Sequence, residues 1–335
     1  MNQKYKPFYF IGNILESDIK SPILLKYGYK IKKASLDQIK VIKTKFEKVH
    51  EATQNIPINI NPYESEFIYT GEGNSYKIKY PKNIDQWKYW ILELDCSIDE
   101  YEKQNDLIRK NIQIIDSAFL LSDFNIQLLW GFLHYQVKEN NVLISAISSQ
   151  NYRPLNYFKS SKNINPKTTK INSNFVNEIN QLATQIEQIF DNERHNQFQK
   201  VINDLVSYFE IPPKSPYRII GLFAIFEHLL TANELGNSIN KQLQTKLNLL
   251  NNRFSEKVEI NKFFKISSGF KFEKIIEKLY AYRSDIAHGN PIDFENKLQV
   301  LNNSELVEDF LLTLVKRTIK QTLYEPDLIT DLKKC

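Results

Sequence analysis

The stretch YRIIGLFAIFEHLL, residues 217–230, reads as an apolar helix that carries one carboxylate. Prolines just before it end the preceding segment, so a helix over residues 217–232 begins cleanly. Glu227 follows Ile220 by seven residues and Phe223 by four, which places its carboxylate on an apolar helix face. A buried carboxylate is costly without a partner, so we expect Glu227 to pair with a cation. The alternative is a surface residue or a purely structural ion pair.

Around this stretch, residues 173–335 show helical spacing and no strand pattern. The last predicted helix covers residues 304–324, with Ser304 as its expected N-cap and acidic residues in its first turns. Apolar residues at helical spacing predict further helices over residues 175–189, 198–209 and 239–250, and one more that ends at residue 288. These six helical segments predict a helical bundle.

A second stretch, AYRSDIAHGNP at residues 281–291, places an arginine and a histidine five residues apart. Apolar residues precede it at helical spacing, and Gly-Asn-Pro is a typical helix stop. The guanidinium of Arg283 is a permanent planar cation suited to a phosphate, and the imidazole of His288 can move protons near neutral pH. Such a pair can act on a phosphodiester without a metal ion, so the spacing indicates a ribonuclease site.

Arg283 and His288 would share a helix face only if the helix ended between them. Five residues of ideal helix rotate a side chain by about 140° and advance it by about 7.5 Å. We expect the Gly-Asn-Pro stop to release His288, so that its ring bends back towards the phosphate held by Arg283. Arg283 is also the expected partner of Glu227, which would hold the guanidinium in place.

The C-terminal half resembles the HEPN superfamily, and most closely its ApeA-like branch. The resemblance rests on RSDIAHG at residues 283–289, on the stretch at 217–230 and on residues 242–254, and it covers the chain from near Asn174 onward. It implies a helical bundle that dimerises and places two Arg/His motifs in one cleft. It also implies a metal-independent RNase of a toxin, anti-phage or RNA-processing system, although some members have lost catalysis and serve as binding modules.

The resemblance and the residue chemistry together give a mechanism. His288 would act as general base on the ribose 2′-hydroxyl or as acid on the leaving 5′-oxygen, while Arg283 stabilises charge on the phosphorus oxygens. Glu227 supports Arg283, and Ser284 and Asp285 are secondary candidates that could contact the ribose, steer Arg283 or only satisfy backbone groups. No metal or cofactor is expected. A silent binding module and a structural dimerisation domain remain as alternatives.

Composition is that of an ordinary globular protein, with a net charge of +5 and two cysteines in 335 residues. No signal-peptide core or membrane-length apolar run is present, so cytoplasmic residence without a membrane partner is expected. The expected partners are an RNA substrate and a second copy of the chain; an antitoxin or phage trigger is not identifiable. Basic residues between Lys241 and Lys278 lead into the motif, either as an RNA track or as an ordinary mixed-charge surface.

Residues 1–150 predict a separate α+β domain, joined to the bundle by a polar, proline-containing linker over residues 151–172. The fold class is therefore mainly α, with a HEPN-like bundle preceded by an α+β domain. Short strands are expected within residues 5–15, 24–31, 76–80 and 87–96, helices over residues 35–49 and 101–119, and a second apolar segment over residues 126–135. The aromatic residues of this domain are either its core or a base-stacking platform.

Overall fold

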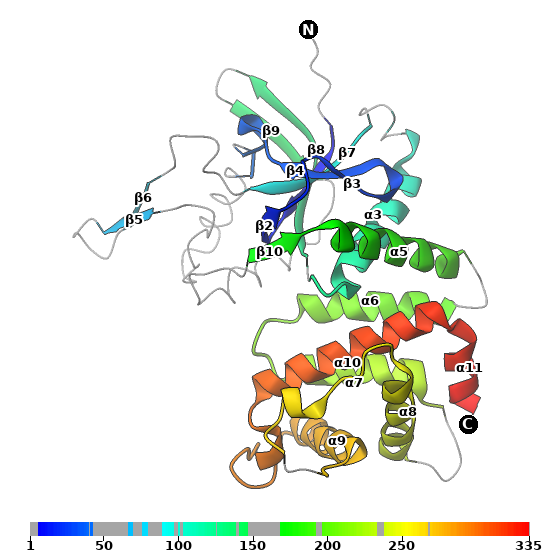
Figure 1. Ribbon diagram of the computed structural model, residues 1–335. Helices are drawn as coiled ribbons and strands as arrows, with labels where there is room; N and C mark the ends of the chain where they lie inside the picture. Colours follow the sequence, from blue (N-terminus) through cyan, green and yellow to red (C-terminus); the bar gives the residue numbers. More distant parts are fainter. Residues whose placement is uncertain are drawn as a thin grey trace. The chain divides into compact units, whose positions relative to one another are not determined.

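The computed structural model shows a mostly helical chain with a small sheet region at its N-terminal end (Figure 1). It describes residues 6–39, 41–42, 66–69, 76–79, 89–96, 100, 103–124, 126–138, 141–146, 168–191, 196–232, 238–266 and 269–334. Contacts divide the chain into two compact units, residues 1–183 and 184–335. The coarse expectation of an α+β region followed by a helical region is therefore confirmed.

The first unit contains ten strands and one complete helix among its described residues. The strands are β1 (Phe8–Ile11), β2 (Ile14–Ser17), β3 (Ile23–Leu24), β4 (Tyr29–Lys33), β5 (Glu66–Tyr69), β6 (Tyr76–Lys79), β7 (Trp90–Leu94), β8 (Leu128–Lys138), β9 (Asn141–Ala146) and β10 (Thr168–Ile171). A short 3₁₀ turn, η1 (Lys26–Gly28), precedes β4, and the helix is α3 (Asn105–Leu121). Residues 36–39 and 41–42 are also helical, while the rest of the predicted helix at 35–49 lies outside the described residues.

The main sheet has the order β3-β4-β7-β1-β8-β9, and each neighbouring pair is antiparallel. Its centre is aromatic, because Phe8 lies opposite Phe132 and Phe10 opposite Trp130 in the β1–β8 register. The ring centroids of these pairs are 4.9 and 5.9 Å apart. Phe8 and Phe10 are fully buried and Trp90 and Trp130 nearly so, which makes these aromatic residues core rather than a base-stacking platform.

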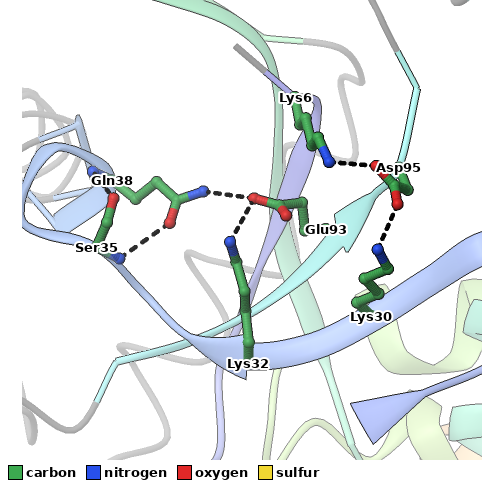
Figure 2. Close-up of polar contacts among 7 residues, drawn as sticks. All are labelled: Lys6, Lys30, Lys32, Ser35, Gln38, Glu93 and Asp95. Atoms are coloured by element: carbon green, nitrogen blue, oxygen red, sulfur yellow. Dashed lines mark hydrogen bonds and ion pairs between the residues drawn. The ribbon is translucent and has the colours of Figure 1, made fainter. Parts of the chain in front are cut away.

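A polar cluster joins β4 and β7 to the short helix that follows β4 (Figure 2). Ser35 and Gln38 form a capping box, since each side chain bonds to the backbone N–H of the other residue. The amide of Gln38 also donates to the buried carboxylate of Glu93 at 3.1 Å, and Lys32 lies 2.8 Å from the same oxygen. The start of the helix is thereby tied to the centre of the sheet.

The same cluster continues at Asp95, just after β7, where two lysines meet one carboxylate (Figure 2). Hydrogen bonds from Lys30 and then Lys6 hold the pKa of Asp95 at about 2. These lysines already have carboxylate partners, so the cluster is not a bare basic surface.

The C-terminal end of the predicted linker over residues 151–172 contains a strand. Residues 168–171 form β10, which pairs with β2 in parallel register from Thr168–Ile14 to Ile171–Ser17. The remainder, residues 151–167, lies outside the described residues. The division between the units falls inside the next helix, α5 (Ser173–Phe190), whose first turn packs Phe175 against Phe119 of α3. A polar composition did not signal the strand, because β10 is short and mostly exposed.

The described residues of the second unit form helices, 3₁₀ turns and connecting loops, and no strand. It contains the last turns of α5, then α6 (Asn196–Glu210), α7 (Tyr217–Leu230), α8 (Ile239–Arg253), α9 (Phe272–His288), α10 (Ser304–Tyr324) and α11 (Pro326–Lys334), with 3₁₀ turns η4 (Ile260–Lys262) and η5 (Gln299–Leu301). All six predicted helices are present. The helix α11 was not predicted, although Pro326 at its first position and Asp327 in its first turn are start signals.

The apolar helix α7 is the centre of this unit: it packs against α6, α8, α9, α10 and α11 (Figure 1). Phe223, Phe226 and Leu230 are fully buried, as the sequence of the stretch predicts. The N-cap of α10 differs from the expectation. Asn303 accepts a hydrogen bond from the N–H of Leu306, and Ser304 is the first helical residue.

Near the start of α7, Arg218 forms a buried network with α6 and α10. Its Nε donates to Glu308 at 2.6 Å, and the hydroxyl of Tyr208 donates to the same oxygen at 2.6 Å. The guanidinium also bonds to the carbonyl of Ile211 and lies over the Tyr208 ring at 4.1 Å. Burial raises the pKa of Tyr208 above its ordinary value, so this hydroxyl stays a donor. The network aligns three helices.

No helix among the described residues is both long and apolar enough to cross a membrane.

Replacement of Glu308 by alanine should lower the free energy of unfolding by about 2–4 kcal/mol, because a buried guanidinium and a hydroxyl lose their shared acceptor. The measurement is urea denaturation at neutral pH. Glu305 lies one turn earlier on α10 with its side chain 78% exposed, so Glu305→Ala is the matched control and should cost less than about 0.5 kcal/mol. Equal costs for the two variants would show that the network does not stabilise the bundle.

Candidate functional site at the end of the motif helix

The motif lies on the last turns of α9, whose apolar face is buried in the bundle. Phe272, Ile275, Ile276, Leu279 and Tyr282 recur at helical spacing and are buried. Arg283 and Ser284 follow this stripe and are partly exposed, while His288 is exposed. The burial of one face therefore leaves the two motif residues accessible.

The side chain of Arg283 contacts Glu227 of α7. Its Nη2 lies 3.3 Å from the Glu227 Oε1, with exposed side-chain fractions of 26% and 21%. Arg283 also lies near the ring of Tyr280, with 5.6 Å between the guanidinium carbon and the ring centroid. Tyr280 in turn meets Phe223 of α7 edge to face at 5.7 Å. A carboxylate and an aromatic ring thus both lie near the guanidinium.

The Glu227–Arg283 pair is an ion pair without a hydrogen bond. The Glu227 Oε1 and the Arg283 Nε are both buried and have no hydrogen-bond partner. A guanidinium carries five N–H donors, so one misaligned carboxylate leaves Arg283 with unused capacity for an oxyanion. The pairing predicted from the sequence is present. It positions Arg283 and leaves N–H donors of the guanidinium without a hydrogen-bond partner.

The helix α9 ends in a Schellman motif. Gly289 adopts a left-handed conformation with φ of 68°, its N–H bonds to the Ile286 carbonyl at 3.2 Å, and the Asn290 N–H bonds to the Asp285 carbonyl at 2.8 Å. Glycine is favoured there because a Cβ is strained at positive φ. The expected helix stop is therefore present, one residue after His288.

This ending corrects the expected geometry of the Arg/His pair. The helix does not end between Arg283 and His288 but continues through His288. Five helical residues separate their directions by about 140°, so the two side chains leave different sides of α9. His288 instead follows Asp285 by three residues and shares its side of the helix. One chain by itself does not bring Arg283 and His288 to the same face.

Asp285 is buried and tied to the loop that follows α9. Lys297 donates to both of its oxygens, at 2.6 and 2.9 Å, and the Asn290 amide lies 3.3 Å from one of them. The ammonium of Lys297 is the main cause that lowers the pKa of Asp285 below its ordinary value, and Asn290 adds to it. Asp285 therefore anchors the turn beside His288 and does not contact Arg283. No hydrogen bond or ion pair of the Ser284 side chain is present among the described residues.

Of the other histidines, only His228 has a described side chain, and it pairs with a single carboxylate. His228 on α7 places its Nδ1 2.6 Å from a carboxylate oxygen of Asp204 on α6. His50 and His195 lie outside the described residues, and the side chain of His134 does so as well. Within the described part of the chain, no group of three or more histidine, cysteine or acidic residues could hold a metal ion.

The basic residues before the motif are only partly available as an RNA track. Lys246 is buried, Arg253 forms a bidentate pair with Glu325, and Lys274 pairs with Glu277. Five further lysines of the run are exposed, so both the RNA track and the ordinary mixed-charge surface stay predictions: Lys241, Lys257, Lys262, Lys265 and Lys271. Closer to His288, Lys278 donates weakly to the Lys297 carbonyl at 3.4 Å, and Lys297 itself is half exposed.

Two residues at the site were missed from the sequence. Tyr280 had a signal, since an aromatic residue three positions before Arg283 lies on the same side of a helix. Lys297 had none, because its contact with Asp285 depends on the path of the loop after residue 289.

Comparison of the chain with protein families, with curated proteins and with solved structures found no match.

Replacement of Asp285 by asparagine should lower the free energy of unfolding by about 1–2 kcal/mol at neutral pH, because Lys297 loses its charged acceptor. The folded-state pKa of Asp285 is lowered, so this stabilisation is fully present above the unfolded-state value. It is lost as the pH falls through the folded-state value, and the gap between wild type and variant should shrink below about pH 4. Urea denaturation over a pH series measures it; a gap that widens on acidification would contradict the assignment.

Replacement of Glu227 by alanine should lower the free energy of unfolding by about 1–2 kcal/mol, because Arg283 is left half-buried without its carboxylate. Glu227→Gln should cost less. The control is Glu277→Ala, which removes an exposed pair with Lys274 on α9 and should cost less than about 0.5 kcal/mol. The Nε–H resonance of Arg283 in ¹⁵N spectra should shift in both Glu227 variants and stay in place in the control. An unshifted resonance would mean that Glu227 does not orient Arg283.

Proposed function

We propose that this chain is a metal-independent endoribonuclease of the HEPN type, acting in a defence or toxin system within the cytoplasm. The observation that supports it best is the placement of Arg283, which lies near Glu227 and Tyr280 while its guanidinium keeps unused donors. A cation in this state is suited to charge that builds on a phosphate in the transition state.

The reaction follows from the two motif residues. The 2′-oxygen of the substrate ribose attacks the adjacent phosphorus, the bond from phosphorus to the 5′-oxygen breaks, and the products are a 2′,3′-cyclic phosphate and a 5′-hydroxyl. His288 takes the proton of the 2′-hydroxyl as general base, or gives a proton to the leaving 5′-oxygen as general acid. Arg283 stabilises the negative charge on the non-bridging oxygens. Because the attacking group belongs to the substrate, DNA should not be cut.

The orientation of the pair favours a site built from two chains. Within one α9, Arg283 and His288 leave different sides of the helix, and one histidine cannot act as acid and base in the same step. A twofold dimer contains two copies of the Arg/His motif. Arg283 of one protomer and His288 of its partner can then meet at one phosphate. The homodimer is therefore part of the proposal.

A catalytically silent binding module is the second candidate. The observation in its favour is that several charged residues around the motif already have ion-pair partners within the fold: Asp285 pairs with Lys297, Arg253 with Glu325 and Lys274 with Glu277. The surface around the motif could then hold RNA or a protein without cutting it.

Activity is tested with purified full-length protein and single-stranded RNA in EDTA. Cleavage should appear without added metal, give 2′,3′-cyclic phosphate ends and fail on the matching DNA. Arg283→Ala and His288→Ala should each abolish cutting, and Glu227→Gln should weaken it by about tenfold, in the range of a lost positioning contact. Arg317→Ala, which removes a pair with Glu256 elsewhere in the bundle, should leave cutting unchanged.

Three outcomes would contradict the proposal. Cleavage by His288→Ala at the wild-type rate would remove this site, and cleavage that requires magnesium would remove the metal-free mechanism. Strictly monomeric protein at tens of micromolar, where a standard interface is saturated, would remove the two-chain site. Light scattering of the same samples supplies this last measurement. RNA binding without cutting would support the silent module instead.

A further inference from the structure

A pocket away from the Arg/His motif lies among α6, α7, α10 and α11. Its volume is about 270 Å³, just below the range of roughly 300–1,000 Å³ that is typical of small-molecule sites. The residues that line it come from all four helices, and Glu227 and Arg283 are not among them. The pocket is therefore a separate feature of the bundle.

One wall of the pocket is apolar. Phe198 and Val201 contribute from α6, Leu229 from the end of α7 and Ile329 from α11. All four are buried in the bundle apart from the surface that they show to the pocket. Such a wall favours a hydrocarbon or aromatic group over water.

The polar part of the lining contains one lysine with a neutral partner. Lys333 donates from Nζ to the amide oxygen of Gln197 at 3.0 Å, and no carboxylate among the described residues lies within ion-pair distance of it. Partial burial lowers the pKa of Lys333, and the positive charge of the buried Lys246 lowers it further. The charged ammonium of Lys333 is therefore partly removed from water and lies near a second positive charge. An anion bound in the pocket would offset both the desolvation and the charge repulsion.

The remaining polar groups on the lining are neutral donors or already engaged. Thr330 is exposed at the rim, and Thr322 donates its hydroxyl to the Thr318 carbonyl. His228 is held by Asp204 through Nδ1, which leaves Nε2 for another contact. One cation with neutral donors suits a single negative charge better than a doubly charged phosphate monoester, which needs more cationic partners.

We propose that this pocket binds a small organic monoanion, with a carboxylate on Lys333 and an apolar body against Phe198, Val201, Leu229 and Ile329. The site is independent of the ribonuclease proposed above and stands whether or not the Arg/His motif is catalytic. Its ligand class is that of short aliphatic or aromatic carboxylates, because the volume excludes long chains.

The test is calorimetric titration of the full-length protein with octanoate as the probe, together with acetate, which lacks the apolar body, and 1-octanol, which lacks the charge. Octanoate should bind at one site per chain, and the other two should bind at least tenfold more weakly. Lys333→Gln should weaken octanoate binding at least tenfold. Lys257 is exposed in the loop after α8 and does not line the pocket, so Lys257→Gln is the matched control and should bind as wild type does.

A second variant distinguishes loss of the binding site from misfolding of the protein. Thr330→Phe places an aromatic ring at the exposed rim, where it can fill the pocket without disturbing the core, and it should abolish octanoate binding while the thermal midpoint stays at or above that of the wild type. The Ile329 methyl resonance should shift on titration of wild type only. Absence of octanoate binding, equal binding of 1-octanol, equal binding of acetate, or full binding by folded Lys333→Gln would each overturn the proposal.

Discussion

The burial of α7 is the constraint on which the rest of the bundle depends. This helix packs against five others, so a charge that it carries into the interior needs a partner. Arg218 pairs with Glu308 of α10, Glu227 with Arg283 of α9, and His228 with Asp204 of α6. Each pair joins α7 to a different neighbouring helix, and the pairs of Arg218 and Glu227 are largely shielded from solvent whereas the pair of His228 is exposed.

The three pairs differ in how completely they are satisfied, and the difference separates structure from candidate function. Glu308 accepts from Arg218 and Tyr208 at 2.6 Å each, so that carboxylate is fully engaged in holding helices together. The Glu227–Arg283 pair lies at 3.3 Å and leaves a buried oxygen and a buried Nε without hydrogen bonds. A pair of this kind contributes little to stability compared with apolar packing of the same volume. Its clearest consequence is to fix the place of the guanidinium.

Sequence reasoning succeeded where a local pattern decides the structure. Helices α5 to α10 follow from apolar spacing with proline and glycine at the ends, and the Glu227–Arg283 pair follows from a carboxylate in an apolar stripe. It failed where a contact depends on the path of the chain between elements. Lys297 reaches Asp285 across a loop, and β10 forms only because β2 offers an edge far away in the sequence. Neither contact leaves a periodic signal.

The ending of α9 shows how one residue of helix changes the chemistry of the motif. Had the helix stopped before His288, the ring could have turned towards Arg283 within the same chain. The left-handed turn at Gly289, with Asp285 held by Lys297 and Asn290, keeps His288 in helical register instead. Any reaction that needs both groups at one phosphate must then take them from two helices, and a second copy of α9 is the economical source. The local cap of a helix thus determines the number of chains that the proposed site requires.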